Sequence, residues 1–326
     1  MHDGLLTGDA AGRSPILLDV TLRDGGYVNG HSWTAWEAAC VVRTMAAAHI
    51  PLVEVGYLRE PSGLSRNPST RCEPAYLEAL AAEAGDTRLA VMIRPGEAPR
   101  ELIRGLGGRG VGLVRVLAAA LDVASAAPYL EAARAQGLPA AVNLTHASRF
   151  GPERIAAAVA EAARAGAAIA YLADSNGSMF PEEVAQRVAA AAEAAAGAGD
   201  GPFTVGFHAH DNLGLAFANT CAALQAGAGA VDASLGGIGK GGGNLRLELI
   251  AGHLALRHGA GYRLDPLVRE RTVAAAKLRM LADGGSNSLV TGLLDLNHDQ
   301  SAEFLEQAAR RGYDQVLRYG LEAATP

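Results

Sequence analysis

Short apolar runs rich in β-branched residues recur through residues 16–235, and they alternate with amphipathic stretches rich in Ala, Glu and Arg. The runs have the length of strands and the stretches have helical spacing, so the sequence predicts repeated β-then-α units. Eight strands are predicted, over Ile16–Thr21, Leu52–Tyr57, Leu89–Arg94, Val111–Leu117, Ala140–Thr145, Ala168–Ala173, Phe203–His208 and Ala230–Leu235. The predicted helices between them include Thr34–Ala48, Ala120–Ala135, Pro152–Ala165, Pro181–Ala196 and Leu215–Ala226.

The predicted strands are too apolar to face water on either side, so they must be covered on both faces. Eight such units predict an α/β fold, a (β/α)8 TIM barrel with a parallel sheet closed inside a ring of helices. A doubly wound open sheet is the alternative. Polar residues follow nearly every predicted strand, which favours the barrel, because a barrel gathers all strand ends around one mouth.

The length of 326 residues and the hydrophobic content of 49% allow one large core and an appendage. We expect a metal-dependent TIM-barrel catalytic domain over residues 15–260 and a C-terminal helical region over 261–326. Three helices are predicted there, over Leu264–Leu281, Leu289–Asp295 and Ser301–Tyr319. This appendage is expected to cover the barrel or an oligomer interface. Alternatively, the stretch Asp283–Ser288 reaches back over the barrel mouth.

Charge and composition exclude several classes of function. A net charge of −6 without a Lys/Arg run argues against nucleic-acid binding. The N-terminus lacks a signal-peptide pattern, and no run approaches the roughly 18 apolar residues of a membrane span. Cys40, Cys72 and Cys221 lie far apart, which indicates reduced thiols. We therefore expect a soluble cytoplasmic protein.

Two segments predict a metal site. LLDVTLRDGGYVNGH, at Leu17–His31, ends a strand on an Arg-Asp pair, and VGFHAHDN, at Val205–Asn212, ends another on two histidines one residue apart. Strand alternation points His208 and His210 to the same face. Two neutral imidazoles and one carboxylate, for which we choose Asp24, suit a catalytic divalent ion with open positions for substrate.

Further polar residues are expected at the barrel mouth. Three are predicted to contact substrate: Arg115, Thr145 and Ser175. The other candidates at strand ends are Glu54, Tyr57, Arg94, Asn143, Asp174 and Asn176. The segment Gly236–Gly243 holds six glycines in eight residues, and it is read either as an anion-binding loop or as a flexible barrel lip.

These motifs resemble a known superfamily. TLRDG, HAHDN and VDASLGGIGKGGGNLRLE at Val231–Glu248 resemble the metal-dependent lyases and aldolases that include hydroxymethylglutaryl-CoA lyase and isopropylmalate synthase. Within that superfamily, YLADSNGSM at Tyr171–Met179 and the glycine-rich run are most similar to the 4-hydroxy-2-oxovalerate aldolases. The resemblance spans residues 15 to about 260.

The resemblance implies site roles. Asp24, His208 and His210 would hold Mn²⁺ or Mg²⁺, with Co²⁺ as a further candidate, and Asn244 would be an additional ligand or near ligand. The ion would act as a Lewis acid on a 2-oxo acid. Arg23 would stabilise the developing enolate; its alternative role is a structural ion pair.

The chain departs from those aldolases at Tyr27, where they carry a catalytic histidine three residues after the aspartate. Either Tyr27 donates or relays protons, or His31 or a water does this work. The tyrosine that the C-terminal region of those aldolases contributes has no evident counterpart in ADGGSNSLVTG, at Ala282–Gly292.

We therefore expect a class II aldolase that makes or breaks a C–C bond between a pyruvate-type 2-oxo acid and an aldehyde. A homo-oligomer is expected, and an aldehyde dehydrogenase partner is implied by the resemblance. Two alternatives stay open at this stage: a Claisen-type condensing enzyme that uses acyl-CoA, and a catalytically inactive barrel that binds metal or a partner.

Overall fold

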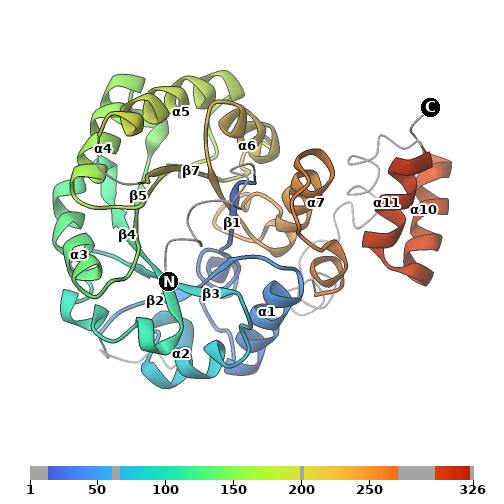
Figure 1. Cartoon of the computed structure of the whole chain (residues 1–326), viewed down its shortest axis with the longest axis horizontal. Coiled ribbons are helices and arrows are strands. Elements are labelled where there is room, and N and C mark those ends of the chain that lie inside the picture. Colours follow the sequence, from blue (N-terminus) through green and yellow to red (C-terminus); the bar gives the residue numbers. More distant parts are fainter. Residues whose placement is uncertain (1–13, 61–66, 199–201, 271–297, 324–326) are drawn as a thin grey trace.

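The computed structural model describes residues 14–60, 67–198, 202–270 and 298–323 (Figure 1). Eight parallel strands pair in chain order, and β1 also pairs with β8, which closes the barrel that the sequence predicts. The strands are β1 (Ile16–Asp19), β2 (Leu52–Tyr57), β3 (Arg88–Ile93), β4 (Val111–Ala118), β5 (Ala140–Leu144), β6 (Ile169–Asp174), β7 (Thr204–Ala209) and β8 (Ala230–Ala233).

Helices surround the barrel, and an α-helix follows every strand except β3 (Figure 1). Two short 3-10 helices, Arg100–Ile103 and Gly107–Arg109, follow β3 instead, so the repeat of one helix per strand that the sequence predicts is interrupted there. The α-helices around the barrel are α1 (Ala35–Ala47), α2 (Pro74–Ala81), α3 (Val123–Ala135), α4 (Pro152–Arg164), α5 (Pro181–Ala196), α6 (Ala216–Gln225) and α7 (Leu247–His258). Their starts follow local signals: Thr34 and Glu37 form a capping box at α1, and Pro begins α2, α4 and α5. Among the described helices, none has the length and apolar character needed to cross a membrane.

Two apolar layers fix the barrel. The larger layer lies between strands and helices, and a smaller one, which includes Leu18, Leu52, Leu113 and Tyr171, fills the barrel interior. Because side chains alternate along a strand, residues two positions further on face the same interior. Buried charged side chains therefore lie above this apolar layer, towards the mouth.

The strand β1 ends two residues earlier than predicted. The backbone turns immediately after it, where the Asp24 amide donates to the Val20 carbonyl at 2.9 Å. This turn leads into a short 3-10 helix, Gly25–Val28, and it places Asp24 at the carboxyl end of the barrel. Active sites of TIM barrels form at this end.

The C-terminal region packs beside α7 (Figure 1). The predicted helix Ser301–Tyr319 is two helices, α10 (His298–Arg311) and α11 (Tyr313–Ala323), because Gly312 between them has φ +91°. A separate apolar cluster joins them to residues 264–270, which are helical: Leu264, Val268, Phe304, Ala308, Val316 and Leu317. The rest of the predicted helix Leu264–Leu281, the predicted helix Leu289–Asp295 and the stretch Asp283–Ser288 lie outside the described residues.

Candidate metal centre

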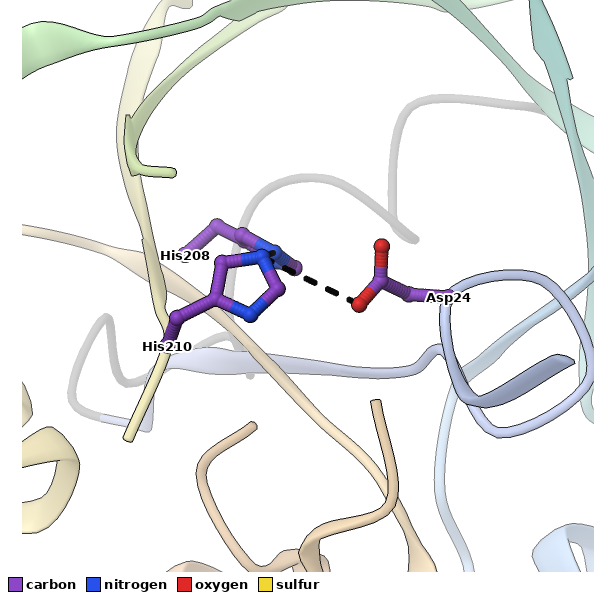
Figure 2. A group of neighbouring side chains, drawn as sticks. All are labelled: Asp24, His208 and His210. Atoms are coloured by element: carbon purple, nitrogen blue, oxygen red, sulfur yellow. Dashed lines mark hydrogen bonds and ion pairs between the residues drawn. The ribbon is translucent and has the colours of Figure 1, made fainter. Parts of the chain in front are cut away.

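Three predicted ligands converge at the barrel mouth. Asp24 follows β1, whereas His208 lies in β7 and His210 just after it. Figure 2 shows the two imidazoles pointing towards the aspartate. Asp24, His208 and His210 are all buried, and one potential ligand atom from each lies within 4.8 Å of the others.

Hydrogen bonds fix which nitrogen of each histidine carries the proton. His208 Nδ1 lies 2.9 Å from Asp232 Oδ2, and His210 Nδ1 lies 3.1 Å from the Gly243 carbonyl oxygen. Both partners are acceptors, so each Nδ1 donates and each neutral ring keeps a lone pair on Nε2. The two Nε2 atoms are 3.3 Å apart, and His210 Nε2 is 3.9 Å from Asp24 Oδ2. Lone pairs that face one another need a cation between them.

Electrostatics keep Asp24 and His210 in the protonation states that a metal requires. Burial raises the pKa of Asp24, but the adjacent Arg23 guanidinium outweighs this effect and holds that pKa well below its usual range. Burial and the neighbouring His208 lower the pKa of His210 to about 4. At neutral pH the carboxyl group is therefore ionised and the His210 ring is neutral.

Asn244 completes the cradle. Its Nδ2 donates to Asp24 Oδ2 and to the Ile238 carbonyl, each at 2.9 Å. Its Oδ1 is buried and has no partner in the described part of the chain. An amide oxygen left unpaired beside two imidazoles and a carboxylate fits a divalent cation, because such ions take mixed N and O donors.

The glycine-rich segment serves as the rim of this cradle. Four backbone amides of the segment donate to acceptors within the protein. The Gly236 amide donates to the Glu248 carboxylate and the Gly242 amide to the Asn212 side-chain oxygen. The Gly237 and Gly243 amides donate to the carbonyls of Ser234 and Lys240. These donors are already used within the protein, which favours the barrel lip over an anion-binding loop. Gly243, at φ +96°, presents the carbonyl that orients His210.

A chain of buried ion pairs supports the centre. Arg23 Nη1 donates to Asp24 Oδ1 at 2.7 Å, and Arg23 Nε donates to Glu54 Oε2 at 2.6 Å. Arg115 Nη1 donates to the same Glu54 oxygen at 3.0 Å, and its Nη2 donates to Asp232 Oδ2 at 2.5 Å. Asp232 then accepts from His208, so charged partners run from one side of the cradle to the other.

Arg115, which is predicted to contact substrate, is fully buried among these ion pairs. Its guanidinium lies 4.3 Å from the centre of the Tyr171 ring, and Gly206 leaves room for that ring, since a Cβ there would lie 2.5 Å from Tyr171 Cδ1. This placement favours a positioning role for Arg115. Contact with substrate stays a prediction.

Thr145 and Ser175 lie together at the mouth. Ser175 Oγ accepts from the His146 amide at 2.9 Å, and Thr145 Oγ1 lies 3.2 Å from His146 Nδ1. His146 has φ +57°, an uncommon backbone conformation for a residue that is not glycine or asparagine. The structure therefore brings these two predicted contacts to one place beside a histidine.

Tyr27 lies in the turn after Asp24 and is partly exposed, as a residue that meets substrate must be. His31 packs against it, with ring centroids 5.1 Å apart. Gly26 makes this packing possible, since a Cβ there would fall among the His31 ring atoms. Gly25 leaves room for another neighbour, since a Cβ there would lie 2.7 Å from Ile238 Cγ1. Burial, followed by the charge of Arg23, lowers the pKa of His31, so this ring is neutral at pH 7.

Asp232 is the residue that our sequence reasoning missed. It lies in the quoted run VDASLGG, but we did not single it out. A carboxylate inside an apolar strand needs a buried partner, because an unpaired buried charge is costly, and this need is the sequence signal that points to Asp232. Burial raises the pKa of Asp232, but Arg115 outweighs that effect and lowers it, so Asp232 is an anion next to His208.

Comparisons with known proteins point to one family. Residues 117–280 match the HMGL-like family. The chain is 33% identical over 258 residues to an oxaloacetate decarboxylase from Mycobacterium tuberculosis, with 78% of this chain and 75% of the relative covered. It is 33% identical over 241 residues to a 4-hydroxy-2-oxovalerate aldolase from Chloroflexus aurantiacus, with 73% of this chain and 68% of that protein covered.

Solved structures show the same fold. The N-terminal domain of a possible aldolase from Bacteroides vulgatus superposes with a TM-score of 0.70 at 23% identity, covering 89% of this chain and 96% of that one. The names of the two relatives, a decarboxylase and an aldolase, support an enzyme of the lyase and aldolase kind. The family match, the two relatives and the barrel together show that this chain belongs to the HMGL-like family.

Proposed function

We propose that this protein is a divalent-metal-dependent aldolase that cleaves or forms a C–C bond between a pyruvate-type 2-oxo acid and an aldehyde. One observation carries the proposal: Asp24, His208 and His210 present lone pairs to one point, with Arg23 bonded to the carboxylate. The ion would be Mn²⁺ or Mg²⁺, with Co²⁺ as a further candidate. When bound, it would supply Lewis-acid polarisation of the 2-oxo group.

Arg23 would add a fixed positive charge next to the oxygen on which enolate charge develops. Its guanidinium is buried and held by two carboxylates, Asp24 and Glu54, so it is oriented before substrate arrives. Preorganised charges of this kind act without reorganisation during the reaction. An active-site role for Arg23 is compatible with its structural ion pairs, because its Nη2 atom does not take part in either of them.

Tyr27 is the proposed proton carrier. In cleavage, the C3–C4 bond breaks, its electron pair enters the enolate, and the C4 hydroxyl becomes a carbonyl as it loses its proton. The Tyr27 phenol would relay the proton in one coupled movement: its oxygen takes the proton of the C4 hydroxyl as its own proton goes to C3. The residue thus ends as it began, and the products are a 2-oxo acid and an aldehyde.

Decarboxylation of a 2-oxo dicarboxylate is the second candidate. The relative from M. tuberculosis is named an oxaloacetate decarboxylase, and loss of CO2 from such an acid leaves the same enolate. Protonation at C3 then completes the reaction. The two candidates share the metal site and Arg23, and they differ only in the group that leaves.

The direct test is exchange of the C3 protons of pyruvate with solvent deuterium, followed by NMR. We expect exchange by metal-stripped protein only after Mn²⁺, Mg²⁺ or Co²⁺ is restored. The variants Asp24→Asn and His208→Ala should lose both bound metal and exchange while remaining folded. His253→Ala, which alters a histidine of α7 outside the site, is the matched control and should retain both.

Each outcome separates the alternatives. Exchange without any added ion, or wild-type metal content in both site variants, would refute the ligand assignment. No exchange with any ion, combined with release of free CoA from an acyl-CoA and a 2-oxo acid, would indicate a Claisen-type enzyme. Tight metal binding without turnover on any of these substrates would indicate an inactive barrel.

A further inference from the structure

A cationic cluster lies beside the proposed metal centre, and of its members only Tyr27 has a role in the steps above. Arg94, just after β3, donates from Nη2 to the Tyr27 hydroxyl at 2.6 Å and to the Tyr57 hydroxyl at 3.1 Å. The two hydroxyls are 3.1 Å apart. Three elements far apart in the chain, the ends of β1, β2 and β3, thus bring one guanidinium and two phenols to one point.

Two hydrogen-bond donors of the cluster have no acceptor in the described part of the chain. Arg94 Nη2 donates to both phenol oxygens, and one hydroxyl can donate to the other, so one phenolic proton has no acceptor among the described residues. Burial raises the pKa of Tyr57 to about 12, which keeps that residue a phenol. Arg94 Nε is also buried without a partner in the described part of the chain. An oxygen-rich anion would accept from both kinds of donor.

The charge of the cluster is also positive. Arg59 lies 4.4 Å from the centre of the Tyr57 ring and pairs with Glu97 at 2.7 Å. Arg94 reaches the same carboxylate only at 3.4 Å. Two guanidinium groups therefore share one carboxylate in this part of the described structure. A second anion would balance the charge.

The cluster borders the metal centre. Tyr27 is three residues after Asp24 in the same turn, and Tyr57 is close enough to Arg23 for each to affect the other electrostatically. A substrate whose 2-oxo acid end lies beside Arg23 therefore extends naturally towards Arg94. Both arginine side chains, Arg59 and Arg94, are about one-third exposed, so substrate can reach them.

We propose that Arg94, with the Tyr57 hydroxyl, binds a carboxylate at the far end of the substrate. The substrate class is then a 4-hydroxy-2-oxo dicarboxylate, and the aldehyde that it releases carries a carboxylate of its own. This inference rests on the proposed function and sharpens it. It makes Arg94 a specificity-determining residue.

The ion pair also selects between the two candidate reactions. Loss of CO2 moves the electrons of the carboxylate into the new enolate, so a carboxylate paired with Arg94 is stabilised against leaving. Aldol cleavage does not consume this carboxylate, because the C3–C4 bond breaks while the carboxylate remains on C4. The cluster therefore favours the aldol reaction for a substrate bound in this way.

A matched pair of inert probes tests the proposal by binding alone. 2,4-Dioxopentanoate and 2,4-dioxopentanedioate share the same chelating head, but only the second has a distal carboxylate. Calorimetric titration of the Mn²⁺-loaded protein should show about 10- to 100-fold tighter binding of the dicarboxylate. Arg94→Ala should abolish this preference, and Arg94→Lys should restore part of it.

Glu97→Gln is the complementary variant. It removes the carboxylate that competes for the two arginines, so the preference for the dicarboxylate should rise by about 2- to 5-fold. If Arg94 only holds Tyr27 in place, Arg94→Ala should weaken both probes equally. Equal affinity of the wild-type protein for the two probes would also overturn the inference.

Different results would refute the carboxylate site and the aldolase function. Binding of both probes together with metal-dependent exchange, but without a preference, refutes the carboxylate site and leaves the aldolase proposal standing. Binding of neither probe with any ion, together with absent exchange, refutes the metal-site function and the inference that rests on it.

Discussion

Replacement of Asp232 by Asn tests how the buried carboxylate controls the metal centre. Asp232 Oδ2 accepts from His208 Nδ1 at 2.9 Å and from Arg115 Nη2 at 2.5 Å, and the residue is about 1% exposed. Asn has nearly the same shape and keeps one acceptor oxygen, but it removes the charge. The variant therefore alters electrostatics more than packing.

Two losses are expected. Hydrogen bonds from carboxylates to metal-binding histidines typically contribute about 10- to 100-fold in metal affinity, so the Kd for Mn²⁺ should rise by this factor, or about 1.4–2.7 kcal/mol. Removing one partner of a buried ion pair costs about 3–5 kcal/mol. Arg115 keeps Glu54 at 3.0 Å, so the free energy of unfolding of the metal-free protein should fall by less, about 2–3 kcal/mol.

Urea unfolding and Mn²⁺ titration measure the two losses separately. Thr87→Val is the control, because Thr87 is also buried and donates from Oγ1 to the Ile50 carbonyl at 2.8 Å, just before β3 and β2 begin at the opposite end of the barrel. The control should lose stability and keep the wild-type Kd for Mn²⁺. A Kd within about twofold of wild type for Asp232→Asn would refute the argument that this carboxylate orients His208 for metal binding.

Three further predictions concern single positions. Gly26→Ala should lower the free energy of unfolding, measured with urea, by about 1–3 kcal/mol, since a Cβ there would overlap the His31 ring. Gly108→Ala is the control and should change this free energy little, because the space around Gly108 is open. Equal effects of the two substitutions would contradict this account. Burial raises the pKa of Asp19 to about 7 in the folded protein, above its ordinary value near 4, so the folded state binds this proton more tightly and loses stability as pH rises from about 4 to about 7. Asp19→Asn should therefore gain stability relative to wild type across this range, by up to about 4 kcal/mol, in unfolding curves at several pH values; a constant difference would be evidence against the assigned cause. Asn244→Ala removes the amide that holds Asp24 and should raise the Kd for Mn²⁺ by about 10-fold, whereas an unchanged Kd in the titration would exclude Asn244 from the site.

The periodicity of the sequence determined the barrel and where its ligands lie along the chain. Alternation of apolar strands and amphipathic helices is local information, and closure was indicated by the polar residues that follow nearly every strand, because a barrel gathers all strand ends around one mouth. His208 and His210 share a face by strand alternation alone. Asp24 could be placed at the same mouth because the carboxyl ends of all barrel strands meet there.

Only the tertiary structure decided how the charged residues pair. Arg23 and Glu54 are 31 positions apart, Arg115 and Glu54 are 61, and Arg115 and Asp232 are 117, so no local pattern indicates which carboxylate meets which guanidinium. The same holds for Arg94, whose contact with Tyr27 spans 67 positions. Strand order and register set these distances, and they place Arg115 among buried carboxylates, an arrangement that the sequence did not indicate.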